Sequence, residues 1–274
     1  MDGLAVADAK SVVAPINFIE PMAEKPYSYN YEPPPGVPPR NTKEATHTVR
    51  VHDARPLNDK LSLDREGFKL LRSPTAARDL YDESEITRVY YPECARLIQE
   101  FTGAKQVHVF DHIVRNAARM GKGSTVKGYA GRVHNDYTAW SAPQRVRDLM
   151  GDEAEELLQH HYAEINVWRP IRGPLLRSPL ALCDATTLVQ ENLVASELRY
   201  PDRTGETYAV TFNPDQRWYY FPEMQADEVV LIRCFDSAQQ GAARFSAHGA
   251  FDHPNTPPDA PPRESIETRA LVFF

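Results

Sequence analysis

Residues 206–237 read ETYAVTFNPDQRWYYFPEMQADEVVLIRCFDS and contain three short apolar runs separated by turn sequences such as NPDQ at 213–216. The runs are rich in valine, isoleucine, tyrosine and phenylalanine, which are typical of strands, whereas asparagine, proline and aspartate mark the turns. Similar short runs recur through the second half of the chain, interrupted by a helical pattern at 142–162. Many short strands at regular spacing predict a jelly roll (double-stranded β-helix), whose inward side chains can meet a ligand.

The predicted fold class is therefore mainly β with flanking helices. A second helical pattern ends at Gly103, and Pro92 fits the first turn of its regular part, so we expect that helix over 92–101. The 274 residues are enough for one large domain. We place the jelly-roll domain at residues 61–274.

Residues 1–60 are predicted to form a proline-rich N-terminal arm. The extreme is YNYEPPPGVPPRN at 29–41, a composition that favours extended conformations without internal hydrogen bonds. A flexible tail is the alternative. Aromatic residues at four positions favour an arm that packs on the domain and closes one mouth or joins two subunits as a homodimer. These positions are Phe18, Tyr27, Tyr29 and Tyr31.

Charge and cysteine content exclude several classes of partner. The formal net charge is −7, and no basic run interleaved with aromatic residues occurs, so nucleic acid is not expected to bind. No apolar run approaches the roughly 20 residues of a membrane span, and no signal-peptide pattern begins the chain. Three distant cysteines, Cys94, Cys183 and Cys234, predict free thiols in a reducing compartment. We expect a cytoplasmic protein.

A candidate metal site begins in VHNDYT at 133–138, where His134 and Asp136 stand two residues apart at the end of a predicted strand. Two histidines and one carboxylate on one face of the metal are typical of non-haem iron(II) sites. His248 and His253 are the candidates for the second histidine. His248 ends the run ARFSAH, whereas His253 lies in a turn-rich loop, so we favour His248.

Other histidines have simpler interpretations. His160 and His161 end the predicted helix, where a cationic side chain meets the helix dipole favourably. His108 and His112 share one face of a predicted strand and could form a second metal pair, but core or hydrogen-bonded histidines are the favoured interpretation.

Two arginines in the last predicted strand, RESIETRALVFF at 263–274, could hold the distal carboxylate of 2-oxoglutarate. Arg263 and Arg269 are six residues apart and share one face, roughly 20 Å from each other along a strand. Arg269 leads into the apolar ALVFF, so we expect it to be buried and to need a carboxylate partner. Arg263 is expected to be the more exposed of the two.

Three further residues are candidates for the cavity. Asn166 lies in EINVWRPI and could hydrogen-bond the cosubstrate, with a structural role as the alternative. Tyr137 follows Asp136 directly and could shape the substrate pocket. Trp218 could contact substrate too, although an aromatic residue in a strand is more often part of the core.

At this point the sequence resembles a known family, the small iron(II)/2-oxoglutarate-dependent oxygenases grouped with fungal gibberellin desaturase, the AsaB-like proteins and the aziridine-forming oxygenases of secondary metabolism. The resemblance covers about residue 60 to the end. One difference is Gly249, since relatives usually have threonine after the distal histidine. The motifs that carry the resemblance are VHNDYT (133–138), EINVWRPI (164–171), PLALCDA (179–185), RWYYFPEMQADEVVLIRCFDS (217–237) and HGAFDHP with PPRESIETRALVFF (248–274).

The resemblance implies a cytoplasmic oxidoreductase that uses Fe(II), 2-oxoglutarate and O₂ to hydroxylate, desaturate or cyclise a small metabolite at an unactivated C–H. The implied metal ligands are His134, Asp136 and His248. Two alternatives stay open: a non-catalytic jelly-roll binding protein, and a cupin-type metalloenzyme that does not use 2-oxoglutarate.

Overall fold

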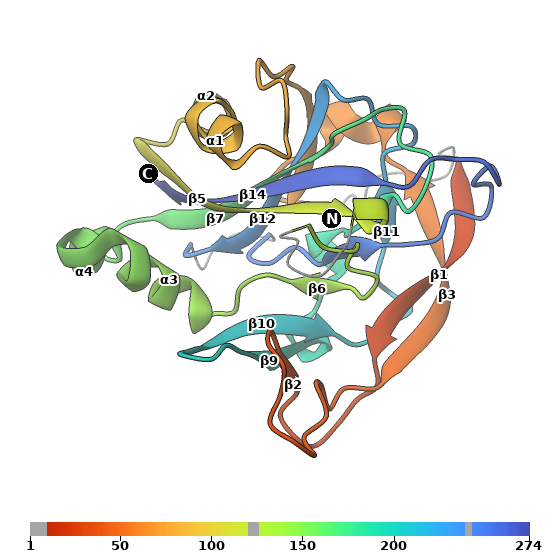
Figure 1. Ribbon diagram of the computed structural model, residues 1–274, viewed down its shortest axis with the longest axis horizontal. Helices are drawn as coiled ribbons and strands as arrows, with labels where there is room; N and C mark the ends of the chain where they lie inside the picture. Colours follow the sequence, from red (N-terminus) through yellow and green to blue (C-terminus); the bar gives the residue numbers. More distant parts are fainter. Residues whose placement is uncertain (1–9, 120–125, 239–242) are drawn as a thin grey trace.

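The protein is described by a computed structural model that covers residues 10–119, 126–238 and 243–274 (Figure 1). Within these residues, nine strands form one sheet in the order β1-β3-β11-β8-β13-β6-β10-β9-β2, and five form a second in the order β4-β12-β7-β14-β5. The larger sheet consists of β1 Ser11–Ile19, β2 Tyr27–Tyr29, β3 Glu44–Asp53, β6 His134–Asn135, β8 Leu180–Cys183, β9 Leu193–Arg199, β10 Thr204–Val210, β11 Trp218–Tyr220 and β13 His248–Ala250. The smaller sheet consists of β4 Phe68–Arg72, β5 Gln106–Asn116, β7 Tyr162–Pro170, β12 Glu228–Asp236 and β14 Glu264–Phe273.

The two sheets enclose the main hydrophobic core, to which strands of both sheets contribute apolar side chains. Trp218 and Leu182 come from the larger sheet, and Trp168 and Ile232 from the smaller one. The predicted jelly roll is confirmed.

The helices flank the two sheets, and some of their residues, among them Ala142, Val146 and Ala154, belong to this core. The helices are α1 Glu83–Glu85, α2 Tyr91–Thr102, α3 Ser141–Met150 and α4 Ala154–Leu157, together with a π-helical turn η2 Ile86–Tyr90 and the 3-10 turns η1 Arg55–Lys60, η3 Ala117–Arg119, η4 Gly151–Glu153, η5 Ala185–Thr187 and η6 Gln190–Asn192. Pro92 occupies the first turn of α2, and Gly103 ends the helix at a φ of 74°, a left-handed conformation that favours glycine, as the sequence predicts. None of the described helices is long and apolar enough to cross a membrane.

Helix α2 covers the outer face of the smaller sheet (Figure 1). Its buried Cys94 and Ile98 pack with outward residues of β7 and β14, among them Ile165 and Val272. Because the outer face is covered in this way, β7 is buried over its whole length and its inward side chains are fixed in position. This rigid strand and its neighbour β14 carry several of the residues discussed below.

Part of the segment predicted as an N-terminal arm belongs to the larger sheet. Strand β1 pairs with β3 over nine residues, and β3 pairs with β11. Phe18 is fully buried and contacts the rings of Trp218 and Phe212 edge-on, at centroid distances of 5.7 and 5.4 Å. The first sheet strand is therefore part of the core.

Replacing Phe18 with alanine is expected to lower the free energy of unfolding by about 3–5 kcal/mol, since it removes a buried aromatic ring and leaves a cavity. Chemical denaturation measures the change. Tyr31 is 38% exposed, so Tyr31→Ala is the control and should change stability by less than about 0.5 kcal/mol. Equal, small effects of both substitutions would show that β1 does not contribute to the folded core.

Candidate metal centre

Three metal-ligand side chains meet on neighbouring strands of the larger sheet. His134 lies in β6 and is followed by Asp136, and β6 pairs with β13 so that His248 stands directly opposite His134. One ligand atom of each of the three residues lies within 4.8 Å of the others. His134 Nε2 is 3.5 Å from Asp136 Oδ1, and the two imidazole centroids are 4.8 Å apart. The strand pairing thus brings together residues 114 positions apart in the sequence.

Both imidazoles are oriented by hydrogen bonds to the backbone. His134 Nδ1 donates to the Arg132 carbonyl at 2.9 Å, and His248 Nδ1 donates to the Ser246 carbonyl at 3.1 Å. With the proton on Nδ1, each Nε2 presents a lone pair to the cluster. His248 Nε2 is buried and has no hydrogen-bond partner among the described residues. Burial, together with His134, lowers the pKa of His248, which keeps it neutral and able to bind a metal.

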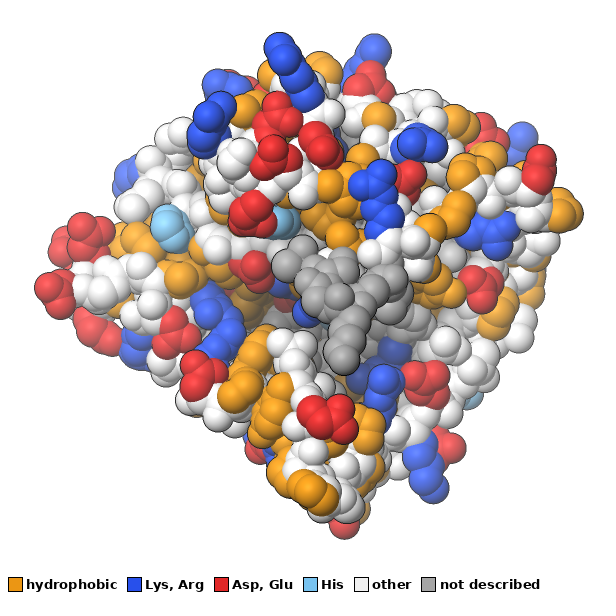
Figure 2. Space-filling model, in the orientation of Figure 1, with side chains coloured by type: hydrophobic (Ala, Val, Ile, Leu, Met, Phe, Trp, Pro, Cys, Tyr) orange, Lys and Arg blue, Asp and Glu red, His pale blue; other side chains and the backbone are white. Residues whose placement is uncertain are grey.

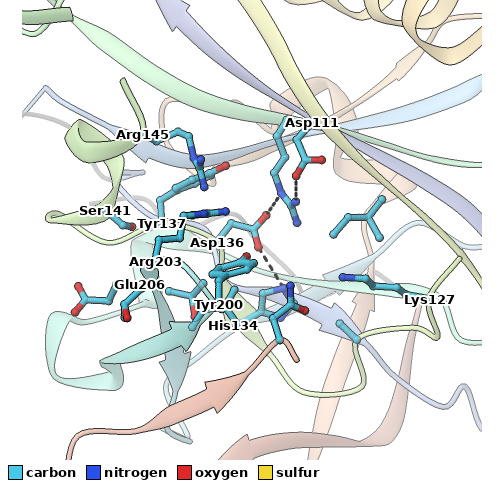
Figure 3. A pocket seen from close by; sticks show the side chains of 18 of the residues that line it. Asp111, Lys127, His134, Asp136, Tyr137, Ser141, Arg145, Tyr200, Arg203 and Glu206 are labelled. Atoms are coloured by element: carbon cyan, nitrogen blue, oxygen red, sulfur yellow. Dashed lines mark hydrogen bonds and ion pairs between the residues drawn. The ribbon is translucent and has the colours of Figure 1, made fainter. Parts of the chain in front are cut away.

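Asp136 is held as a carboxylate. Burial alone would raise its pKa, but the Arg269 guanidinium and the two imidazoles hold the pKa of Asp136 well below its ordinary value. Arg269 Nε donates to Asp136 Oδ2 at 3.0 Å, and its Nη1 donates to Asp111 Oδ2 at 2.8 Å; Figure 3 draws these contacts at Asp111 and Asp136. Two imidazoles and one carboxylate on one side of a small space are the donor set that suits iron(II).

Asn166 and Glu267 form a second layer behind Asp136. Asn166 Nδ2 donates to Asp136 Oδ2 at 2.8 Å and to Glu267 Oε1 at 2.5 Å, while its Oδ1 has no partner among the described residues. Glu267 Oε1 also lies 3.8 Å from His248 Nε2. Asn166 therefore orients the carboxylate of Asp136.

Arg263 is a buried arginine without an anion, as is Arg169, and the expectation that Arg263 would be more exposed than Arg269 is wrong. It is 6% exposed, and no carboxylate lies within 4 Å of it in the described part of the chain. Its Nη1 donates to the Ser178 carbonyl at 2.8 Å, and its Nε has no described partner. The burial comes from groups distant in the sequence, namely the Tyr129 and Trp168 rings and the Ser178 carbonyl, which surround the guanidinium.

The surroundings of Arg263 are aromatic and cationic. Its guanidinium lies over the rings of Tyr129 and Trp168, at 5.5 and 5.7 Å from their centroids. Burial, with a further contribution from Arg115, lowers the pKa of Arg263 to about 9. Arg269, by contrast, has both of its anions supplied by the chain itself. A buried, unpaired guanidinium is costly, so the site of Arg263 is suited to a carboxylate from outside the chain.

A cavity of about 1090 Å³ opens beside the three ligand residues and is lined by His134, Asp136 and Tyr137, among others (Figures 2 and 3). Tyr137 is 6% exposed and follows the carboxylate directly, as the sequence suggested. Trp218 is not among the lining residues: it is fully buried in the core against Phe18.

The remaining histidines lie outside this cluster. His253 is hydrogen-bonded to the Tyr220 hydroxyl at 3.2 Å. His112 is hydrogen-bonded to the Tyr91 hydroxyl at 2.8 Å and lies 3.3 Å from the Glu83 carboxylate. His112 is thus a hydrogen-bonded histidine, the interpretation favoured over a second metal pair.

Sequence reasoning missed Glu267 and Asp111. Glu267 could have been predicted from strand alternation. Every second residue shares one face of a strand, and the inward face here carries Arg263, Ser265, Glu267 and Arg269. Asp111 could be found only from the pairing of β5 with β14, which places it opposite Arg269.

Comparisons with known proteins agree with this geometry. The family model described as Oxidoreductase/YMDC permease-like domain matches residues 16–273. An Fe(II)/2-oxoglutarate-dependent dioxygenase of Aspergillus novofumigatus is 35% identical over 93% of this chain and 94% of its own length. A hydroxylase/desaturase of Hormonema carpetanum is 34% identical over 85% of each protein. The solved structure of the iron and alpha-ketoglutarate-dependent endoperoxidase NvfI is 32% identical, covers 96% of this chain and 98% of its own, and superposes with a TM-score of 0.88.

Proposed function

Because the chain belongs to the family of Fe(II)/2-oxoglutarate-dependent oxygenases that includes these fungal enzymes, we propose that His134, Asp136 and His248 hold its iron and that Arg263 binds the far carboxylate of 2-oxoglutarate. The enzyme is an oxidoreductase of secondary metabolism that acts on a small molecule.

The observation that carries the metal assignment is the orphaned His248 Nε2, buried beside His134 and Asp136 with no hydrogen-bond partner in the described chain. Buried polar atoms are almost always paired, so an unpaired imidazole nitrogen that points at two other ligand atoms supports a metal site. The backbone carbonyls that fix both imidazoles supply the orientation that metal-binding histidines need.

The cosubstrate assignment rests on the contrast between the two arginines. Arg269 is neutralised by Asp136 and Asp111 and so holds a ligand residue in place, whereas the buried guanidinium of Arg263 has no anion. A planar guanidinium can bind a carboxylate through two parallel hydrogen bonds. This reverses the order in which the sequence ranked the arginines, and it disfavours a metalloenzyme without 2-oxoglutarate, which would have no use for Arg263.

When bound, iron and 2-oxoglutarate supply the activation of O₂ for attack on a C–H bond, and the chain supplies orientation and exclusion of water. Asn166 and Arg269 fix the carboxylate of Asp136 from behind. Tyr137 forms part of the cavity wall next to Asp136. Hydroxylation, desaturation and ring closure begin with the same C–H attack, so the position of the substrate in the cavity decides among them.

Turnover of the cosubstrate tests this function. The protein reconstituted with Fe(II) in air should convert 2-oxoglutarate to succinate, measured by mass spectrometry, and the matched variant Asp136→Ala should form none above background. Arg88 is exposed and does not line the cavity, so Arg88→Gln should behave as wild type. Absence of 2-oxoglutarate consumption by wild type, with and without a library of candidate metabolites, would refute the oxygenase function.

Two further features of the protein are proposals of the same kind. The three cysteines of the chain are free and buried, which supports the cytoplasmic location predicted from the sequence. A homodimer through the N-terminal strands is supported by the edge-on cluster of Tyr27, Tyr29 and Tyr31 beside Arg199 near the edge strand β2. Light scattering measures the oligomeric state, and a monomer at all concentrations would rule out the dimer.

A further inference from the structure

The cavity beside the metal ligands is positively charged, although the whole protein carries a formal net charge of −7. Seven of the lining residues are lysine or arginine and five are aspartate or glutamate, which leaves an excess of two positive charges. Figure 2 shows lysine and arginine side chains gathered around the hollow at the centre of this face. An anionic protein that concentrates cations in one cavity favours an anionic ligand there.

Every acidic residue of the cavity already has a cationic partner. Glu44 pairs with Arg40 at 3.5 Å, Asp148 with Arg145 at 3.8 Å, Glu206 with Lys25 at 2.8 Å, and Asp111 and Asp136 both with Arg269. The acids of the cavity are therefore not available to neutralise its other cations.

Four lining cations have no acidic partner within 4 Å in the described part of the chain: Arg115, Lys127, Arg132 and Arg203. Within the described residues, Arg115 donates to the Gly128 carbonyl at 2.7 Å, and burial lowers its pKa. The Arg132 Nη1 donates to the Thr42 hydroxyl at 2.6 Å. Neither contact compensates a positive charge.

Iron and 2-oxoglutarate do not neutralise the excess positive charge of the cavity. Fe(II) brings two positive charges and the 2-oxoglutarate dianion two negative ones, so the pair adds no net charge to the cavity. Arg263, which lies outside the lining of the cavity, is assigned to the cosubstrate above. The unpaired cations of the cavity are therefore left for the substrate.

Arg132 is the unpaired cation best placed to position a substrate near the metal ligands. It stands two residues before His134 in extended backbone, and both line the same cavity, so their Cα atoms are about 7 Å apart. Arg203 is exposed and lies over the ring of Tyr200 at 4.0 Å, and Figure 3 shows Arg203 and Tyr200 on the side of the cavity opposite Asp111.

Aromatic side chains complete the cavity. Trp140 and Tyr129 line it and are 54% and 43% exposed, and Phe110 and Tyr200 line it as well. Large exposed aromatic residues at a cavity are typical of binding sites for apolar bodies.

We propose that the substrate is an apolar or aromatic carboxylic acid whose carboxylate is bound by Arg132, with its body against the aromatic side chains of the cavity. The inference rests on the proposed function, because it assigns to the substrate the cationic side chains that iron and 2-oxoglutarate leave without an anion. Arg132 then sets which C–H bond of the acid is turned toward the metal ligands.

A matched pair of fluorescent probes tests the charge requirement: 1-pyrenebutyrate, an aromatic carboxylate, and 1-pyrenebutanol, its neutral counterpart. Binding is measured anaerobically to the protein saturated with Fe(II) and 2-oxoglutarate. Wild type should bind the acid more tightly than the alcohol. Arg132→Gln should raise the Kd of the acid at least tenfold and that of the alcohol less than twofold. The control Arg88→Gln, with the same loss of charge outside the cavity, should match wild type for both probes.

Three outcomes would overturn the inference: no preference of wild type for the acid, an equal effect of Arg132→Gln on both probes, or the same effect of Arg88→Gln on the acid. Calorimetry on the same samples separates this inference from the function it rests on. Arg132→Gln should leave the Kd of 2-oxoglutarate within twofold, and a large increase would place Arg132 in the cosubstrate site instead. If wild type with Fe(II) does not bind 2-oxoglutarate, the proposed function itself fails.

Discussion

His248→Ala is expected to abolish Fe(II) binding and the conversion of 2-oxoglutarate to succinate. The substitution removes one of two imidazoles and leaves only His134 and Asp136, which cannot form the three-ligand face of a non-haem iron site. The fold should survive, because the substitution removes one described hydrogen bond, from His248 Nδ1 to the Ser246 carbonyl, while Nε2 has no partner whose loss would cost stability. Anaerobic calorimetric titration with Fe(II) measures the binding, and circular dichroism checks the fold.

His253→Ala is the matched control. His253 lies five residues farther along the chain and bonds to the Tyr220 hydroxyl, away from the metal ligands. Its iron titration should equal that of wild type. Retention of iron by His248→Ala together with its loss in His253→Ala would show that the second histidine of the site has been assigned wrongly.

Arg263→Ala should raise the Kd of 2-oxoglutarate at least tenfold. A charge-assisted hydrogen bond contributes about 1.5–3 kcal/mol, and about 1.4 kcal/mol corresponds to a factor of ten. Arg263→Lys should recover only part of the affinity, because an ammonium lacks the planar pair of donors. Calorimetry with 2-oxoglutarate in the presence of Fe(II) and absence of O₂ measures both variants.

Two comparisons separate cosubstrate binding from structural damage. Arg263 is a buried cation without an anion, so Arg263→Met should leave the melting temperature of the metal-free protein unchanged or raise it. Arg269→Ala should weaken iron binding first, because Arg269 fixes Asp136. If Arg269→Ala impairs 2-oxoglutarate binding while iron binding is intact, and Arg263→Ala does not, the two arginines exchange roles.

The sequence predicted those parts of the site that depend on local pattern. His134 and Asp136 stand two residues apart at a strand end, and His248 follows a short apolar run, so each could be recognised from its own neighbourhood. Helix α2 was predicted for the same reason, since Pro92 and Gly103 mark its ends locally. The jelly roll followed from the repeated alternation of short strands and turns.

The two arginines show where local pattern fails. Apolar neighbours suggested that Arg269 is the more buried, but Arg263 is covered by Tyr129 and Trp168, which lie far from it in the sequence. The same holds for β1, whose pairing with β3 across a proline-rich stretch gives Phe18 a core position that composition alone does not predict. Partners such as Asp111 for Arg269 arise from register between distant strands.

The most direct test of the account is an anaerobic crystal structure of the protein with Fe(II) and 2-oxoglutarate. The account predicts iron within coordination distance of His134 Nε2, Asp136 and His248 Nε2, with the far carboxylate of 2-oxoglutarate against the guanidinium of Arg263. Iron bound elsewhere, or a cosubstrate carboxylate paired with Arg269 while Arg263 stays without an anion, would contradict it.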